Sequence, residues 1–194
     1  MIDTPQSPPG ARRAAFDRLV LPLAPALYRT ARRMTRRADE ASGIAGDTVV
    51  RAWRAFDEAP TGRDARGWLF GELWRTLLEF WQREGRTVAP PGPDSADDIL
   101  AAVVDGDPDD LDRAILSRLD ASPDVDVSLR QLSKAERFAV LLVDVEDFPY
   151  EEAARAIGCD VATLAARLLA GRARLCAHLV DYTRRTSGVH ESLT

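Results

Sequence analysis

The sequence predicts an all-α protein in which two small helical domains are joined by an acidic linker. Apolar residues recur at helical spacing along nearly the whole chain, and almost no stretch alternates as a strand would. A segment rich in proline, residues 89–93, separates two such regions. The charge divides at the same place. Residues 1–93 carry +4 (15 Arg, 11 acidic), residues 94–128 carry −9 (2 Arg, 11 Asp), and residues 129–194 are neutral, within a net charge of −5.

The first module is predicted to be a three-helix domain over residues 11–88, after a flexible tail at 1–10 that contains three prolines. The predicted helices run from about Arg13 to Met34, from Ala38 to Phe56 and from Asp64 to Glu84. Pro60 to Gly62 should end the second helix, and Gly85 should end the third.

The acidic linker is predicted over residues 89–126, with short helical patches, and the second domain over residues 127–185. Ser133 and Glu136 have the spacing of a capping box, which predicts a helix start there. That helix should continue to about Val145, followed by helices at 150–157 and 161–182. Residues 186–194 are polar and are predicted to form a tail.

The last two predicted helices have the spacing of a helix-turn-helix. Ala154 allows a close helix crossing, Gly158 permits a left-handed turn, and Leu164 fills the angle between the helices. Asp160 is placed to cap the second helix. Arginines downstream favour DNA binding over an ordinary helical hairpin, although this motif alone does not distinguish a transcription initiation factor from a repressor.

The residue types present indicate no catalytic or metal site. The chain has two isolated histidines, and Cys159 and Cys176 lack a CxxC spacing, so we expect no metal and no cofactor. Serines and cysteines have no plausible base nearby, so we do not expect an enzyme. No apolar run approaches the roughly 18 residues that a membrane span needs, so we expect no membrane insertion. Reduced cysteines fit a cytoplasmic protein.

Read together, the two modules resemble the extracytoplasmic-function (ECF) sigma factors of the sigma-70 family. The similar segments for region four are 129–137, 147–154, 157–159 and 163–175, and those for region two are 41–56, 67–70 and 76–83. The resemblance covers roughly 150 residues in the expected order, which is more specific than any single motif. It implies a region two bundle and a region four helix-turn-helix.

The resemblance also implies partners and binding residues. It implies binding to core RNA polymerase, to promoter DNA and to an anti-sigma factor, by a protein that is monomeric when free. It places polymerase contacts at Glu40, Asp47, Arg51 and Arg54. It places DNA contacts at Arg63, Arg66, Trp74, Arg75, Arg83, Arg86, Thr163, Arg167, Arg172 and Arg174. The acidic linker is either a mimic of nucleic acid in a basic channel or a solvated connector.

Some positions depart from the family pattern. Gly43 and Gly46 replace polar residues of the polymerase-binding helix, and Glu72 stands where an apolar residue is common. Ala165, Ala166 and Ala170 stand where polar or basic residues are usual in the recognition helix, which removes likely DNA contacts. Trp74 is as compatible with core packing as with base stacking. An alternative function is therefore a sigma-like adaptor that binds a sigma regulator or the polymerase without reading promoters. A free-standing DNA-binding regulator is a third, which leaves the first module unexplained.

Overall fold

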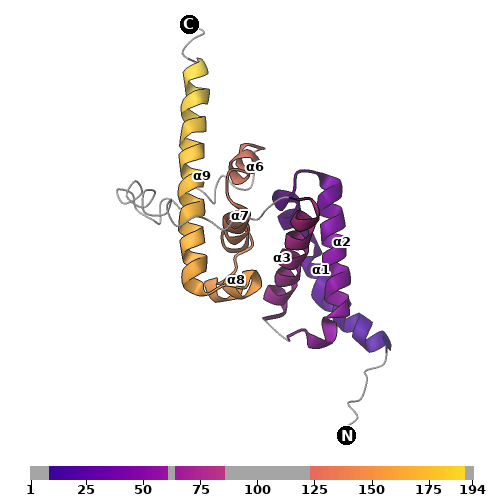
Figure 1. The fold of residues 1–194 in the computed structure, drawn as a ribbon. Helices are drawn as coiled ribbons and strands as arrows, with labels where there is room; N and C mark the ends of the chain where they lie inside the picture. Colours follow the sequence, from indigo (N-terminus) through magenta and orange to yellow (C-terminus); the bar gives the residue numbers. More distant parts are fainter. Residues whose placement is uncertain (1–8, 61–63, 86–122, 191–194) are drawn as a thin grey trace. The chain divides into compact units, whose positions relative to one another are not determined.

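The protein folds into two helical units, as a computed structural model shows for residues 9–60, 64–85 and 123–190 (Figure 1). The chain divides between Glu84 and Gly85. All regular elements within these described ranges are helices, which confirms the predicted all-α class. None of the helices in those ranges is both long and apolar enough to cross a lipid bilayer.

The first unit is a bundle of three helices. Its elements are α1 (Pro9–Met34), α2 (Ala38–Arg54), the 3₁₀ turn η1 (Phe56–Glu58) and α3 (Asp64–Arg83). Each of the three α-helices contacts the other two (Figure 1). Leu27 of α1 and Leu69, Phe70 and Leu77 of α3 are fully buried between them. Burial of this apolar surface, at about 25 cal/mol per Å², is the main force that holds the bundle together.

α1 begins four residues earlier than the sequence predicted. Pro9 occupies its first turn, where a missing amide hydrogen costs no helical hydrogen bond. α3 ends within one residue of its predicted end, and Gly85 follows it with φ of +63°. That left-handed conformation is easily adopted by glycine, so the predicted stop at Gly85 is confirmed.

The predicted second helix ends early because its last residues join an aromatic cluster. The ring of Phe16 meets Trp53 and Phe56 edge-on, at 5.1 and 5.2 Å between ring centroids. The Arg12 guanidinium lies over the Trp53 ring at 4.1 Å and donates to Asp57 at 2.8 Å and to the Trp53 carbonyl at 2.9 Å. We call Arg12, Phe16, Trp53, Phe56 and Asp57 the N-terminal cluster. Its contacts hold the start of α1 against η1.

The second unit is built on one long helix. Its elements are α6 (Pro123–Leu129), α7 (Lys134–Val140), the π-helical turn η3 (Leu141–Val145), α8 (Tyr150–Ile157) and α9 (Val161–His190). α9 contacts α6, α7 and α8, and α8 lies crosswise at its start (Figure 1). α9 extends eight residues beyond its predicted end, into the expected tail. α6 begins inside the predicted linker, and the predicted helical patches before it lie outside the described residues.

Local signals set the start of α7 and its contact with α9. The Ser133 amide donates to Glu136 Oε2 at 2.9 Å, and the Glu136 amide donates to Ser133 Oγ at 3.3 Å, which confirms the predicted capping box. Further along, a Cβ on Gly171 would lie 3.0 Å from Val140 Cγ2. Glycine at this position therefore lets α9 lie close against α7.

Candidate polymerase and nucleic-acid interfaces

An open groove of about 1310 Å³ lies between α2 and α3 of the first unit. Among its lining residues are Asp47, Arg51 and Arg54 from α2 and Glu72, Arg75 and Arg83 from α3. Five of these six are predicted binding residues, three for polymerase and two for DNA. The fold therefore brings both predicted sets to one surface of this unit.

A carboxylate inside the groove organises its arginines. Glu72 is only 3% exposed and pairs with Arg75 one turn later on α3. Its second oxygen lies 4.0 Å from Nε of Arg51 on α2. Arg51 also pairs with Glu79, so it reaches across from α2 to α3. Buried charges are costly unless paired, and the two arginines supply that pairing.

Other predicted residues of this unit have different surroundings. Glu40 accepts from the amides of Arg36 and Arg37, at 3.2 and 3.4 Å, so its carboxylate caps the start of α2. Arg66 is half-buried near the start of α3. Arg63 and Arg86 lie outside the described residues.

Two tryptophans of α3 pack against each other inside the bundle. Trp74 is 7% exposed and Trp81 is 2% exposed, and their rings meet edge-on at 5.8 Å between centroids. Trp74 therefore has the core position that the sequence allowed, and its ring could stack on a base only after moving. Trp68 is half-buried and lines the groove.

The second unit contains the predicted helix-turn-helix geometry. Gly158 has φ of +77°, and Ala154 and Leu164 are buried where α8 and α9 meet. The Thr163 amide donates to Asp160 Oδ1 at 2.6 Å, which confirms the predicted cap. This contact with Thr163 holds the pKa of Asp160 below its ordinary value.

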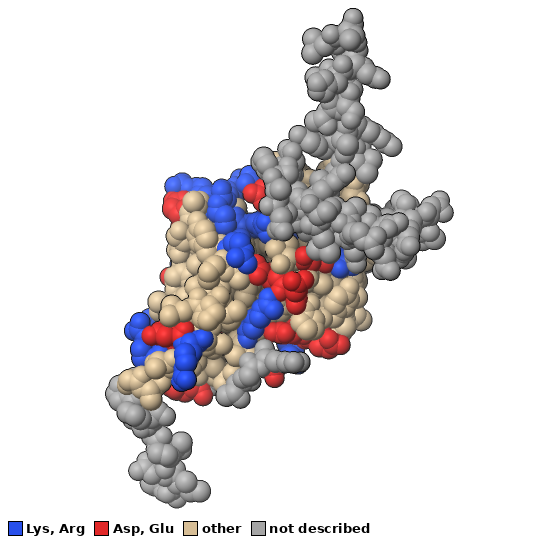
Figure 2. All heavy atoms as spheres, turned by 180° about the vertical axis from the view of Figure 1, so that it is seen from behind, with Lys and Arg blue, Asp and Glu red and all other residues tan. Residues whose placement is uncertain are grey.

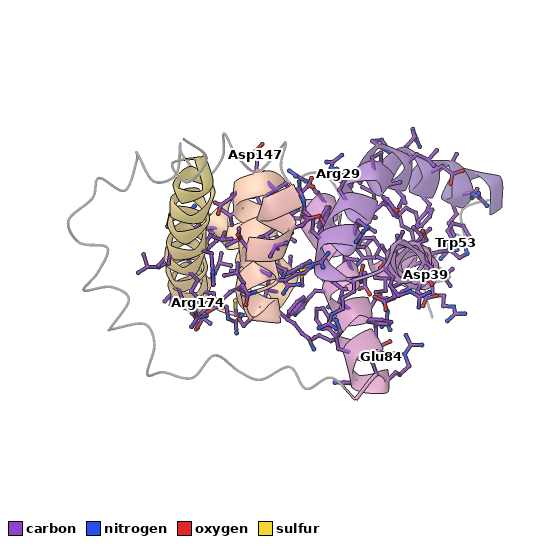
Figure 3. All side chains as sticks on the ribbon, turned by 90° about the horizontal axis from the view of Figure 1, so that it is seen from above. Arg29, Asp39, Trp53, Glu84, Asp147 and Arg174 are labelled. Atoms are coloured by element: carbon purple, nitrogen blue, oxygen red, sulfur yellow. The ribbon has the colours of Figure 1, made fainter. Side chains whose placement is uncertain are left out.

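The three α9 arginines predicted to contact DNA, Arg167, Arg172 and Arg174, have different surroundings. Arg172 donates to Asp144 at 2.6 and 3.2 Å, and Arg174, labelled in Figure 3, pairs with the buried carboxylate of Glu136. We expected both to project toward DNA, but the structure folds them back onto α7 and η3. Arg167 lies nearer the start of α9, and its Nε is buried without a hydrogen-bond partner in the described part of the chain.

On the face shown in Figure 2, the basic side chains of the described residues do not form one continuous patch. Figure 2 shows Lys and Arg interspersed with Asp and Glu over the described part of the face that it displays. Within the described residues, no group of three or more His, Cys, Asp or Glu side chains could hold a metal ion. The arginine and carboxylate side chains at these surfaces offer charge pairing and hydrogen bonding.

Sequence comparison assigns both units to one family. The family described as "Sigma-70 region 2" matches residues 19–87, and that described as "Sigma-70, region 4" matches residues 124–175. The chain is 28% identical over 177 residues to the ECF RNA polymerase sigma factor SigE of Mycolicibacterium smegmatis, covering 91% of this chain and 66% of SigE. It is 30% identical over 178 residues to the RNA polymerase sigma factor NccH of Alcaligenes xylosoxydans xylosoxydans, covering 87% of this chain and 92% of NccH.

A solved structure agrees with this assignment. The sigma factor RpoE from Bartonella quintana, in complex with the anti-sigma factor NepR, matches with a TM-score of 0.64 at 26% identity, over 85% of this chain and 96% of RpoE. The chain belongs to the ECF sigma factors of the sigma-70 family. Its function is that of a sigma factor, which directs promoter-specific transcription initiation.

Sequence reasoning missed two features of the first unit. One is the pairing of buried Glu72 with Arg75 and Arg51. The only indication of it in the sequence was a charged residue at a position where the family commonly has an apolar one. The other is the N-terminal cluster, whose signal was the helical spacing of Arg12 with Phe16 and of Trp53 with Phe56. Both depend on which helix faces are brought together, which spacing within one helix does not reveal.

Proposed function

We propose that α2 docks on core RNA polymerase while the groove beside it holds a promoter strand. The observation that carries this proposal is that both sets of residues line the same groove. Asp47, Arg51 and Arg54 are on its α2 wall, and Arg75 and Arg83 are on its α3 wall. Arginine pairs with both carboxylate and phosphate, so such a surface suits an acidic partner. The α2 wall of the groove then serves the protein partner, and the α3 wall serves DNA.

In the second unit, we assign the upstream promoter contacts to the start of α9. Thr163 and Arg167 lie in its first two turns, as expected for a recognition helix in the major groove. Arg172 and Arg174 act chiefly in holding α9 to α7 and η3, since breaking either pair would leave an uncompensated, largely buried carboxylate. With alanine at 165, 166 and 170, this helix should have a shallow sequence preference.

Further partners follow from the relatives. RpoE is in complex with the anti-sigma factor NepR, so we propose that an anti-sigma factor also binds this chain. We further propose that the free protein is monomeric, acts in the cytoplasm and needs no cofactor. Its acidic linker is proposed to occupy a basic channel of the polymerase, because such a segment resembles nucleic acid electrostatically.

The deciding experiment is promoter-specific transcription by core polymerase with and without the purified chain, on a template library randomised in both promoter elements. Selected templates that require the chain would support the proposal. Binding to core polymerase without any promoter-dependent product would favour the adaptor alternative, which the tied arginines of α9 and the exposed glycines of α2 motivate. Sequence-specific DNA binding without affinity for core polymerase would favour the free-standing regulator.

A further inference from the structure

Glu72 is a buried acid in the wall of a groove that should attract acidic partners. It lies on α3, one turn before Arg75 and one turn after Trp68, and its side chain is 3% exposed. One oxygen contacts Arg75 Nη1, and the other faces Arg51 Nε at 4.0 Å. A carboxylate here lowers the positive potential of the groove, so its presence needs another physical reason.

Stability alone does not supply that reason. Replacing a buried ion pair by an apolar residue of similar volume is often neutral or stabilising. Leu69 and Leu73, the neighbours of Glu72 on α3, are fully buried apolar residues, so the surroundings could accept a leucine. What an apolar residue could not do is hold a guanidinium in a fixed place. Arginine has substantial rotamer entropy, and ordering it before binding removes that cost from the binding step.

We propose that Glu72 is a positioning residue, which holds the Arg75 guanidinium at the groove for a phosphate of a separated promoter strand. The inference rests on the proposed function of the groove. Arg75 pairs with Glu72 through Nη1, yet its side chain is 61% exposed, so a guanidinium with five donors is held in place and remains accessible to a ligand. A phosphate can accept two of those donors from a planar guanidinium at once.

The groove favours DNA over polymerase as the ligand of Arg75. Arg51, on the α2 wall, is 34% exposed and already faces two carboxylates, Glu72 and Glu79. Arg75 is more exposed and faces one. Arg83 lies eight residues further along α3 and also lines the groove, about 12 Å away along the helix axis. Two arginines spaced along one helix can follow the backbone of a strand.

The test measures promoter opening by holoenzyme, on a template first selected by the wild-type protein. The variants are Arg75→Gln, Glu72→Gln, their combination, and Glu72→Leu, with opening followed by thymine reactivity toward permanganate. We expect Arg75→Gln to reduce the opening constant about tenfold, the value of a lost charge-assisted hydrogen bond. Glu72→Gln and Glu72→Leu should each reduce it about three- to tenfold, and Glu72→Gln should add less than twofold in the Arg75→Gln background.

Controls separate positioning from charge and from folding. Arg13 and Asp17 form an exposed pair on α1, so Arg13→Gln and Asp17→Asn make the same charge changes away from the groove, and opening should be unchanged. Glu72→Gln should bind non-specific duplex DNA as well as or better than wild type, because a negative charge is lost. A merely misfolded protein would lose both activities, and circular dichroism checks the helical content of each variant.

Two failures can be told apart. If Arg75→Gln opens promoters as wild type does, the proposed DNA contact of the groove is wrong and the inference is overturned with it. If Arg75→Gln is defective but Glu72→Gln or Glu72→Leu opens promoters normally, only the positioning role is overturned. An additive loss in the double variant would also overturn it, because Glu72 would then act independently of Arg75.

Discussion

Gly46 and Gly158 should respond to alanine in opposite directions, although a Cβ at either position would meet nothing within 4 Å. Gly46 lies inside α2 and is exposed, so its only effect is on helix propensity. Gly158 has φ of +77°, a conformation that alanine adopts at a cost. Because neither substitution creates a contact, the backbone alone decides the sign of the change.

The magnitudes follow from the two conformations. Alanine is favoured over glycine by about 0.8–1.0 kcal/mol in a helix interior, so Gly46→Ala should stabilise the first unit by about 1 kcal/mol. A left-handed residue with a Cβ costs about 1–2 kcal/mol, so Gly158→Ala should destabilise the second unit by that amount. For domains of this size, each kcal/mol corresponds to about 4–8 °C in Tm.

The tryptophans allow each unit to be followed separately. All four lie in the first unit, at positions 53, 68, 74 and 81, whereas circular dichroism reports helices of both units. Gly46→Ala should therefore raise the midpoint seen by tryptophan fluorescence. Gly158→Ala should lower a transition seen by circular dichroism and leave the fluorescence midpoint in place. Stabilisation by Gly158→Ala, or destabilisation by Gly46→Ala, would refute the reasoning from backbone conformation.

Three further predictions concern binding and pH. Combining Asp47→Arg with Arg51→Glu should abolish capture of core polymerase in a pull-down, and wild-type capture would show that α2 is not the docking helix. Arg167→Ala should reduce run-off transcription on all promoters with little change in their rank order, since a phosphate contact positions without specifying sequence; a reordered promoter series would contradict this. Asp160 has a lowered pKa in the folded state, so its stabilising contribution is complete above about pH 3.9 and is lost as the pH falls through the folded value. Asp160→Asn keeps the cap and should remove that part of the acid sensitivity, measured by denaturant unfolding between neutral and acidic pH; an unchanged pH profile would contradict the assignment.

Features set by neighbours in the sequence were predictable. The capping box at Ser133 and Glu136, the left-handed Gly158 and the cap at Asp160 each depend on residues within one turn, and the structure confirms all three. The order of helices followed from apolar spacing for the same reason. Helix ends were less predictable. The last helix was predicted to end at Tyr182, but α9 continues to His190 and contains no proline that would end it earlier.

Features set by distant partners were not predictable from spacing. Arg172 and Arg174 have the spacing of an exposed, DNA-facing pair, but their partners Asp144 and Glu136 lie 28 and 38 residues away. The burial of Trp74 likewise depends on how α3 lies in the bundle, and sequence spacing allowed both core and surface positions. Candidate DNA contacts are therefore reliable only after ion pairs within the protein have been counted.

The N-terminal cluster has a practical consequence for dissecting this protein into fragments. The family match begins at residue 19, which invites a truncated version of the first unit starting there. Such a fragment would lack Arg12 and Phe16 and would uncover the rings of Trp53 and Phe56. The rings of Trp53, near the end of α2, and of Phe56, in η1, would then be exposed to solvent. Exposed aromatic surface of this kind promotes self-association. The smallest autonomous version of this unit therefore begins before Arg12, outside the boundary drawn by sequence similarity.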